Sequence, residues 1–70
     1  MLVYQTLNEK EALKLIGRYV NHMRHGECIG MYKLRAVYVD GTVQLYDRYQ
    51  EDLFVVPLAE IANAVVIEEI

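Results

Sequence analysis

Apolar and polar positions along the chain change period near Met31, which predicts a helix followed by strands. Before that point the apolar residues recur at the spacing of a helix and cover one broad side. They are Ala12, Leu13, Leu15, Ile16, Tyr19, Val20 and Met23. The pattern therefore predicts an amphipathic helix over residues 8–25, preceded by residues 2–5 as an edge strand or a tail.

The ends of this helix carry recognisable signals. Thr6 and Glu9 fit a capping box, and Asn8 with Glu11 offers a second one in an overlapping register. Gly26 suits the position just after a helix, because glycine tolerates the left-handed backbone found there. The helix start is therefore fixed only to within two residues.

A β-hairpin is predicted over residues 32–49, where apolar and polar residues alternate. Asp40-Gly41 is a strong signal for a two-residue type I′ turn, which would set Val39 opposite Thr42. One face would then enter the core with Tyr32, Leu34, Ala36, Tyr38, Val43, Leu45 and Tyr49. The opposite face would become basic and aromatic away from the turn, with Lys33, Arg35, Tyr46 and Arg48. Asp47 would fall on the core face, so we expect it at the sheet margin or bound to a partner.

The remainder of the chain predicts two more strands with a short helical turn between them. Residues 53–56 are apolar throughout, which indicates a strand covered on both sides and ended by Pro57. Residues 57–62 predict one short helical turn, and residues 65–68 a last strand. The predicted fold is therefore α+β, an N-terminal amphipathic helix packed on a small antiparallel sheet of three or four strands.

The order of helix, long hairpin, strand, proline-led turn and strand resembles the small Sm-like and SH3-like barrels. In those folds a short helical turn joins the last two strands, as residues 57–62 would here. The resemblance implies a closed barrel as the alternative to an open sheet with one packed helix, which we favour.

Length and composition favour one small self-associating domain over residues 1–70. A chain this short buries a limited core, and such domains usually gain stability from disulfides, a metal or a partner chain. Cys28 is the only cysteine, so no disulfide can form within the chain. Because 54% of the residues are hydrophobic, we expect a homo-oligomer.

Localisation and membrane contact follow from the same composition. A lone cysteine fits a reducing compartment. The first residues do not show the basic start and following apolar run of a signal peptide, so we expect none. The longest apolar run, residues 53–59, is far shorter than a membrane span. We expect a soluble, cytoplasmic protein with no membrane partner.

Catalytic signatures are weak. The sequence has no serine, and its glycines match neither the P-loop nor the dinucleotide-binding spacing. The carboxylates of Glu60, Glu68 and Glu69 are interpreted as solvated charge. We therefore expect no enzymatic activity and no cofactor.

A possible metal site is the run His22, His25 and Cys28, with Glu27 as a fourth ligand. The alternative is that the histidines sit at a helix C-terminus, where positive charge is favourable, and that the cysteine is buried. Because the sequence has no second cluster of His or Cys, we expect no metal.

Two basic features remain as candidate binding sites. One is the hairpin patch of Lys33, Arg35, Tyr46 and Arg48, and the other is a helix stripe of Lys10, Lys14, Arg18 and His22. Aromatic rings on a sheet can stack bases while cations hold phosphates, which favours single-stranded nucleic acid. However, the net charge is −3, and domains that bind nucleic acid are usually basic overall. The sequence therefore favours a small non-enzymatic regulator that binds another protein as a homodimer, with single-stranded nucleic acid as the alternative ligand.

Overall fold

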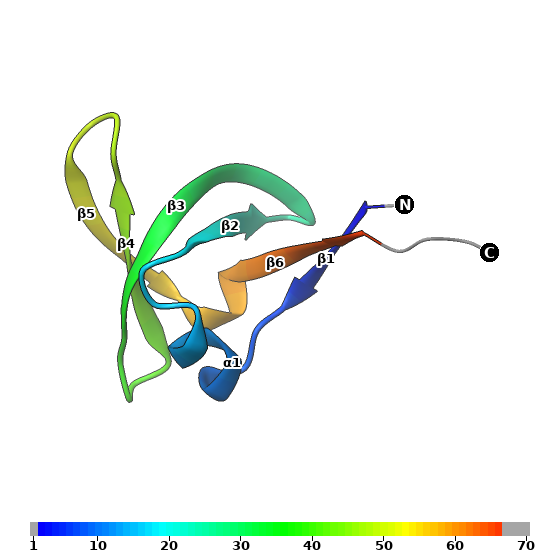
Figure 1. Ribbon diagram of the computed structural model, residues 1–70, viewed down its shortest axis with the longest axis horizontal. Helices are drawn as coiled ribbons and strands as arrows, with labels where there is room; N and C mark the ends of the chain where they lie inside the picture. Colours follow the sequence, from blue (N-terminus) through cyan, green and yellow to red (C-terminus); the bar gives the residue numbers. More distant parts are fainter. Residues whose placement is uncertain (1, 67–70) are drawn as a thin grey trace.

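The computed structural model describes residues 2–66 as one antiparallel sheet with a short helix (Figure 1). The helix α1 spans Glu9–Lys14, and a 3-10 turn, η1, spans Leu58–Glu60. The six strands are β1 (Leu2–Thr6), β2 (Tyr19–Arg24), β3 (Glu27–Val37), β4 (Thr42–Asp47), β5 (Asp52–Pro57) and β6 (Ile61–Val66). Of the predicted last strand, Ile67 and Glu68 lie outside the described residues, as does Glu69.

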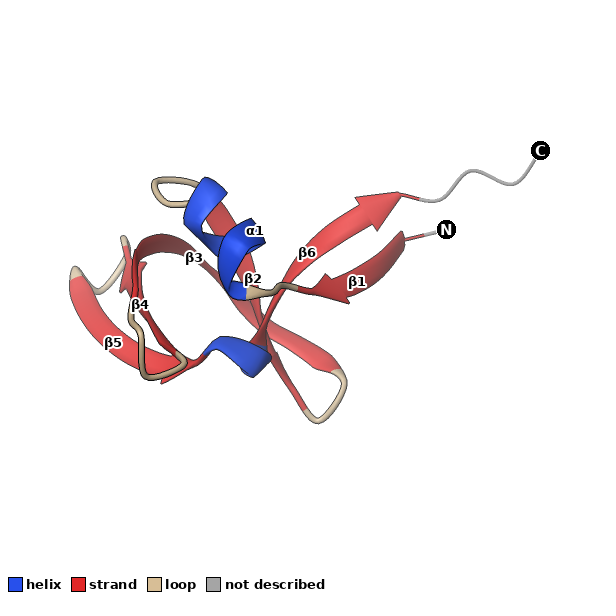
Figure 2. Cartoon of the chain, turned by 90° about the horizontal axis from the view of Figure 1, so that it is seen from below, coloured by secondary structure: helices blue, strands red, loops and turns tan. Residues whose placement is uncertain are grey.

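The sheet order is β1-β6-β2-β3-β4-β5, so β2 to β5 form a meander and β6 lies between β1 and β2. Figure 2 shows that the sheet is strongly curved, with η1 connecting β5 to β6. Within residues 2–66, β1 and β5 each pair with a single strand, so the sheet keeps two edges. The prediction of an N-terminal helix packed on three or four strands is therefore wrong, and the alternative of a closed barrel does not form among these residues.

The predicted helix over residues 8–25 is also wrong, because α1 ends at Lys14. Its start is as predicted in the second register, since Asn8 and Glu11 form the capping box. Gly17 then adopts a φ of 91°, a left-handed conformation that interrupts a helix. The segment from Tyr19 continues as a strand with Val20 and His22 on its buried side.

A second hairpin, which the sequence did not predict, reverses the chain between β2 and β3. Arg24 lies opposite Glu27, and the two residues between them have φ angles of 54° (His25) and 77° (Gly26). Positive φ at both central positions is the mark of a type I′ turn. Gly26 therefore serves a strand reversal and not a helix end.

The hairpin of β3 and β4 exists, but its turn and register differ from the prediction. The Tyr38 N–H donates to the Thr42 carbonyl, so the loop has three residues, and only Gly41 among them has positive φ. This is the pattern of a turn closed by a left-handed glycine, and it moves the register by one residue relative to a two-residue turn. A bulge between Leu34 and Ala36 moves it again.

These shifts change which hairpin residues enter the core. Leu34 lies opposite Leu45 instead of Asp47, and both leucines are fully buried with Val43. Tyr38 and Tyr49, predicted for the core, are exposed, with Tyr49 at 83%. The core also includes the following residues from other elements: Leu7, Ala12, Val20, Val56 and Ile61.

The strand β5 is covered on one side only. Its Phe54 and Val56 face the core, opposite Leu45 and Val43 of β4, whereas Val55 is 54% exposed. The prediction that this apolar strand is covered on both sides is therefore wrong. Its predicted end at Pro57 and the helical turn that follows are present as the last residue of β5 and η1.

The β3–β4 turn predicts an acid-dependent contribution to stability. The Thr42 hydroxyl (2.6 Å) and the Thr42 N–H (3.1 Å) donate to Asp40 Oδ1, and these bonds lower the pKa of Asp40 below its usual 3.8. A carboxylate with a lowered pKa in the folded state stabilises the fold above its unfolded pKa and stops doing so as the pH falls through the folded value.

We expect Asp40→Ala to lower the melting temperature at neutral pH and to lower it progressively less as the pH falls below 3.8. Thermal unfolding followed by circular dichroism over this range measures the difference, with Lys10→Ala as a control at another exposed position. A difference that is independent of pH would contradict the assignment.

Candidate binding surface

The outer face of the meander gathers cationic and aromatic side chains from several strands. Tyr19 of β2 lies opposite Lys33 of β3, and Lys33 lies opposite Tyr46 of β4. Directly opposite residues share a face of a sheet, so these three side chains form a row across three strands. We define the basic–aromatic face as Tyr19, Lys33, Arg35, Tyr46, Arg48 and Tyr49.

Arg48 is the most highly organised residue of this face. Its guanidinium carbon lies 5.6 Å from the centre of the Tyr19 ring and 4.9 Å from that of Tyr49. Its Nη2 also donates to the Tyr49 hydroxyl at 2.8 Å, and this bond raises the pKa of Arg48. The cation is therefore held between two aromatic rings while remaining open to a ligand.

The loop that carries Arg48 and Tyr49 is fixed by Asp47. The Tyr49 N–H (2.9 Å) and the Gln50 N–H (3.3 Å) both donate to Asp47 Oδ1. This explains why a carboxylate occurs where the hairpin pattern predicted an apolar residue, and it agrees with the prediction of a place at the sheet margin. Asp47 follows Tyr46 on the strand, so its side chain points to the opposite side of the sheet.

Arg35 reaches the face because of the bulge in β3. The bulged residue of such a pair has no direct partner, and the local bend re-aims its side chain. The Arg35 guanidinium carbon lies 6.0 Å from the centre of the Tyr46 ring. The four hairpin residues predicted as a binding patch are thus brought together, although by a different register from the predicted one.

A shallow hollow of about 350 Å³ adjoins the face and is lined by Tyr19, Met31, Arg48 and Tyr49. Three of these residues are not predicted by the sequence pattern, which places Tyr19 in a helix, Tyr49 in the core and Met31 in no site. The alternation of Tyr19 and Asn21 with Val20 and His22 was the available signal for a strand here.

The predicted helix stripe does not form. Lys10 and Lys14 lie on α1, whereas Arg18 lies in the connection before β2. His22, the fourth member, is buried in β2 with 5% of its surface exposed. A stripe with a four-residue period requires a continuous helix, and the helix ends too early.

The predicted metal candidates are also separated in the fold. His22 is buried, His25 is exposed in the β2–β3 turn, and Cys28 donates weakly to Asn21 Oδ1 and the Gly30 carbonyl, both at 3.5 Å. In residues 2–66 no three His, Cys, Asp or Glu side chains are placed so that they could hold one metal ion.

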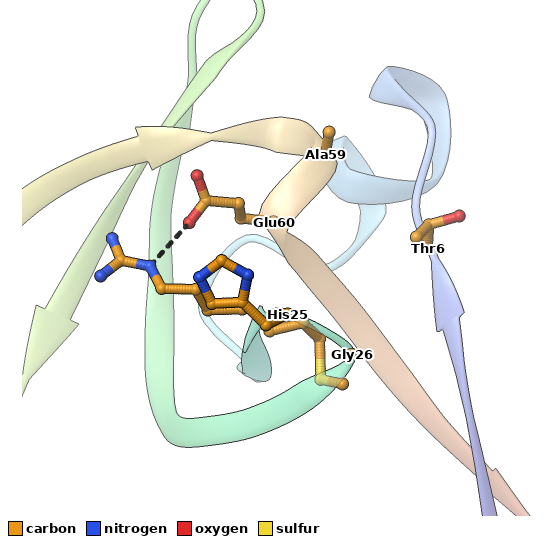
Figure 3. Close-up of a pocket in the computed structure, with 7 residues that line it drawn as sticks. Thr6, His25, Gly26, Ala59 and Glu60 are labelled. Carbon is orange, nitrogen blue, oxygen red and sulfur yellow. Dashed lines mark ion pairs between the residues drawn. The ribbon is translucent and has the colours of Figure 1, made fainter.

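A polar cluster beside this turn joins β2 to η1. His22 Nε2 lies 3.1 Å from Glu60 Oε1, and the Arg24 Nε lies 3.8 Å from the same oxygen. An adjacent hollow of about 590 Å³ is lined by Thr6, His25 and Glu60, among others. Figure 3 shows these side chains. Glu60 was predicted to be solvated, because its pairing with a histidine 38 residues away has no local signal in the sequence.

The His22 ring is also part of an aromatic group. Its centroid lies 6.1 Å from that of Tyr32 and 6.2 Å from that of Phe54, and the last two rings meet edge to face at 4.9 Å. Through the contacts of its ring and the bond from its Nε2 to Glu60, His22 joins β2, β3, β5 and η1.

A proposal for this chain can rest only on the features just described, chiefly the basic–aromatic face and the polar cluster around Glu60. No family model, no curated protein and no solved structure gave a match to this chain. Among the described residues, no helix is both long enough and apolar enough to cross a membrane.

Proposed function

We propose that this chain is a non-enzymatic binding module that recognises another protein through the basic–aromatic face, and that it acts as a homodimer. The observation that carries the proposal is Arg48 held between the rings of Tyr19 and Tyr49, beside the row that contains Tyr46. Tyrosine and arginine dominate the binding energy of protein interfaces, and methionine, present here as Met31, is also enriched in them.

The charges of the face indicate the chemistry of the partner. Lys33, Arg35 and Arg48 supply three cations, whereas Asp47 is turned to the other side of the sheet. An acidic segment of a partner protein would therefore be attracted to this face. The overall charge of −3 disfavours binding along an extended polyanion such as a nucleic acid, and so favours a protein that presents a local acidic segment.

Replacing Tyr46 and Arg48 together with alanine tests the proposal. Both lie on the outer side of the sheet, so we expect the circular dichroism spectrum to be unchanged and the affinity for the partner to fall at least tenfold, as for loss of a hot spot. Partners are captured from an extract of the source cells, and their dissociation constants are then measured with the wild-type and variant chains.

The matched control is Lys10→Ala with Lys14→Ala, which removes two cations from α1 instead. The control variant should bind like the wild type. Equal loss with both variants would show general charge attraction, and unfolding of Tyr46→Ala with Arg48→Ala would show that the face is structural; either result would contradict the proposal.

Single-stranded nucleic acid is the second candidate, because three tyrosine rings and three cations share one sheet face. It predicts binding of labelled oligonucleotides that weakens with salt at a slope of about −2 on logarithmic axes for three phosphate contacts. Absence of binding at low salt, with no excess absorbance at 260 nm in the purified protein, would exclude it.

A further inference from the structure

The edge strand β5 lacks the protection that exposed strand edges usually have. Edges are normally blunted by charged side chains, proline or a bulge, because their unpaired backbone groups invite another strand. β5 pairs with β4 without a register shift, and its four central residues, 53–56, are all apolar. Asp52 and Pro57 lie only at its ends.

The outward side chains of this strand add apolar surface to the open edge. Leu53 is 51% exposed and Val55 is 54% exposed, while Phe54 and Val56 between and beside them face the core. The other edge strand, β1, also exposes Leu2 and Tyr4 but ends in the polar residues Gln5 and Thr6. Of the two strand edges in the described chain, that of β5 therefore has the longer run of apolar residues, four against three in β1.

We propose that β5 pairs antiparallel with β5 of a second copy of this chain, about a two-fold axis that passes through Phe54. The proposal rests on the homodimer part of the proposed function and names its interface. A two-fold axis perpendicular to the sheet keeps the same face of both copies on the same side. Leu53 then lies opposite Val55 of the second copy, and Asp52 lies opposite Val56.

Register and charge favour a second copy as the occupant. Centring the axis on Val55 would place Leu53 opposite Pro57, which has no N–H to donate. Centring it on Leu53 would bring the two Asp52 carboxylates to two positions apart, about 7 Å at 3.3 Å per residue. With the axis at Phe54, the two Asp52 carboxylates are four positions apart, about 13 Å at 3.3 Å per residue. The edge is thus self-complementary, and its uncharged centre offers no attraction to a charged partner.

Such a dimer would join two binding faces. The row of Tyr19, Lys33 and Tyr46 ends at Leu53, which lies opposite Tyr46. Across the proposed axis the row continues onto Val55 of the second copy and onto Gln44, the β4 residue opposite that valine. A partner protein could therefore contact both copies on one continuous side of the sheet.

Light scattering coupled to size-exclusion chromatography tests the proposal over a wide range of protein concentration. The wild-type chain should have twice the 8.1 kDa mass of one chain. Val55→Lys places a charge on the outward side of the edge and should give a monomer with an unchanged circular dichroism spectrum. Tyr4→Lys, the matched change on β1, should leave the dimer intact.

The outcomes separate this interface from the homodimer itself. A wild-type chain that is monomeric throughout would overturn both. A wild-type dimer that persists in Val55→Lys would overturn only the β5 interface.

Should Val55→Lys fail to fold, cysteine cross-linking in a Cys28→Ala background decides the matter. A mixture of Leu53→Cys and Val55→Cys chains should form a disulfide-linked dimer on oxidation, and neither chain should do so alone. No cross-link in the mixture would overturn the proposal.

Discussion

His22→Ala should lower the free energy of unfolding by about 3 kcal/mol, which is the range for removing a large buried side chain. The ring is 5% exposed and packs against Tyr32 and Phe54, so its loss leaves a cavity in the aromatic group. It also leaves Glu60 without its closest partner. A chain of this length has a total stability of roughly 4–10 kcal/mol, at 0.05–0.15 kcal/mol per residue, so this loss is a large part of it.

Urea denaturation followed by circular dichroism measures the effect, and Arg24→Ala is the matched control. Arg24 approaches the same Glu60 oxygen at 3.8 Å, but its side chain is 60% exposed, and exposed ion pairs contribute about 0–1 kcal/mol. We therefore expect a much smaller loss for Arg24→Ala than for His22→Ala. Equal losses would show that the charge on Glu60, and not the buried ring, holds η1 to β2.

Gly30→Ala should also destabilise the fold, by about 1–3 kcal/mol, as for overpacking of a core. Glycine within a strand is usually the weaker choice, so alanine would ordinarily be expected to stabilise. Here a Cβ on Gly30 would lie 2.6 Å from Tyr32 Oη and 2.8 Å from two carbons of the same ring. The ring would have to move away from Phe54, against which it packs edge to face.

A double-mutant cycle with Tyr32→Leu isolates this clash. In the Tyr32→Leu chain the ring is absent, so Gly30→Ala should cost much less there than in the wild type. Urea unfolding of the four chains gives the coupling energy. A cost of Gly30→Ala that is the same in both backgrounds would mean that the glycine is needed for another reason.

The helix was overpredicted because two periods overlap in residues 9–24. Val20 and His22 alternate as a strand requires. Yet Val20 also fits the apolar face of a helix with Ala12 and Ile16, and His22 fits its polar stripe with Lys14 and Arg18. Tertiary pairing decides between the two, since β2 pairs with both β3 and β6. Nothing in residues 9–24 indicates that β6, about 40 residues later in the chain, supplies the second partner of β2.

A single turn residue, Asp40, changes the loop length and therefore the register of the whole β3–β4 hairpin. Asp40-Gly41 correctly predicts where the chain reverses, but Asp40 keeps a negative φ and uses its carboxylate to bind Thr42. The loop is then one residue longer than predicted, and every pair moves. Because the bulge at Arg35 moves the register again, Lys33 and Tyr46 still reach the outer face.

The basic–aromatic face was therefore predictable in its hairpin residues, but Tyr19 and Tyr49 were not predicted as members of it. Alternation predicts Lys33, Arg35, Tyr46 and Arg48 together on one face. In the structure, Arg35 reaches that face through the bulge in β3, and Arg48 lies one residue beyond the end of β4. Tyr19 comes from a segment that the helical pattern concealed. Tyr49 lies beyond β4, in a loop whose conformation depends on the hydrogen bonds to Asp47.

The place of β6 between β1 and β2 sets the order in which a nascent chain can fold. The hairpins of β2 to β5 join neighbouring segments and close short loops, whereas β1 must wait for residues 62–66 to be synthesised. Contacts between distant segments form slowly, because the loop between them must be closed first. During synthesis the basic–aromatic face is therefore assembled first, on a meander whose β2 edge stays open until the last strand arrives.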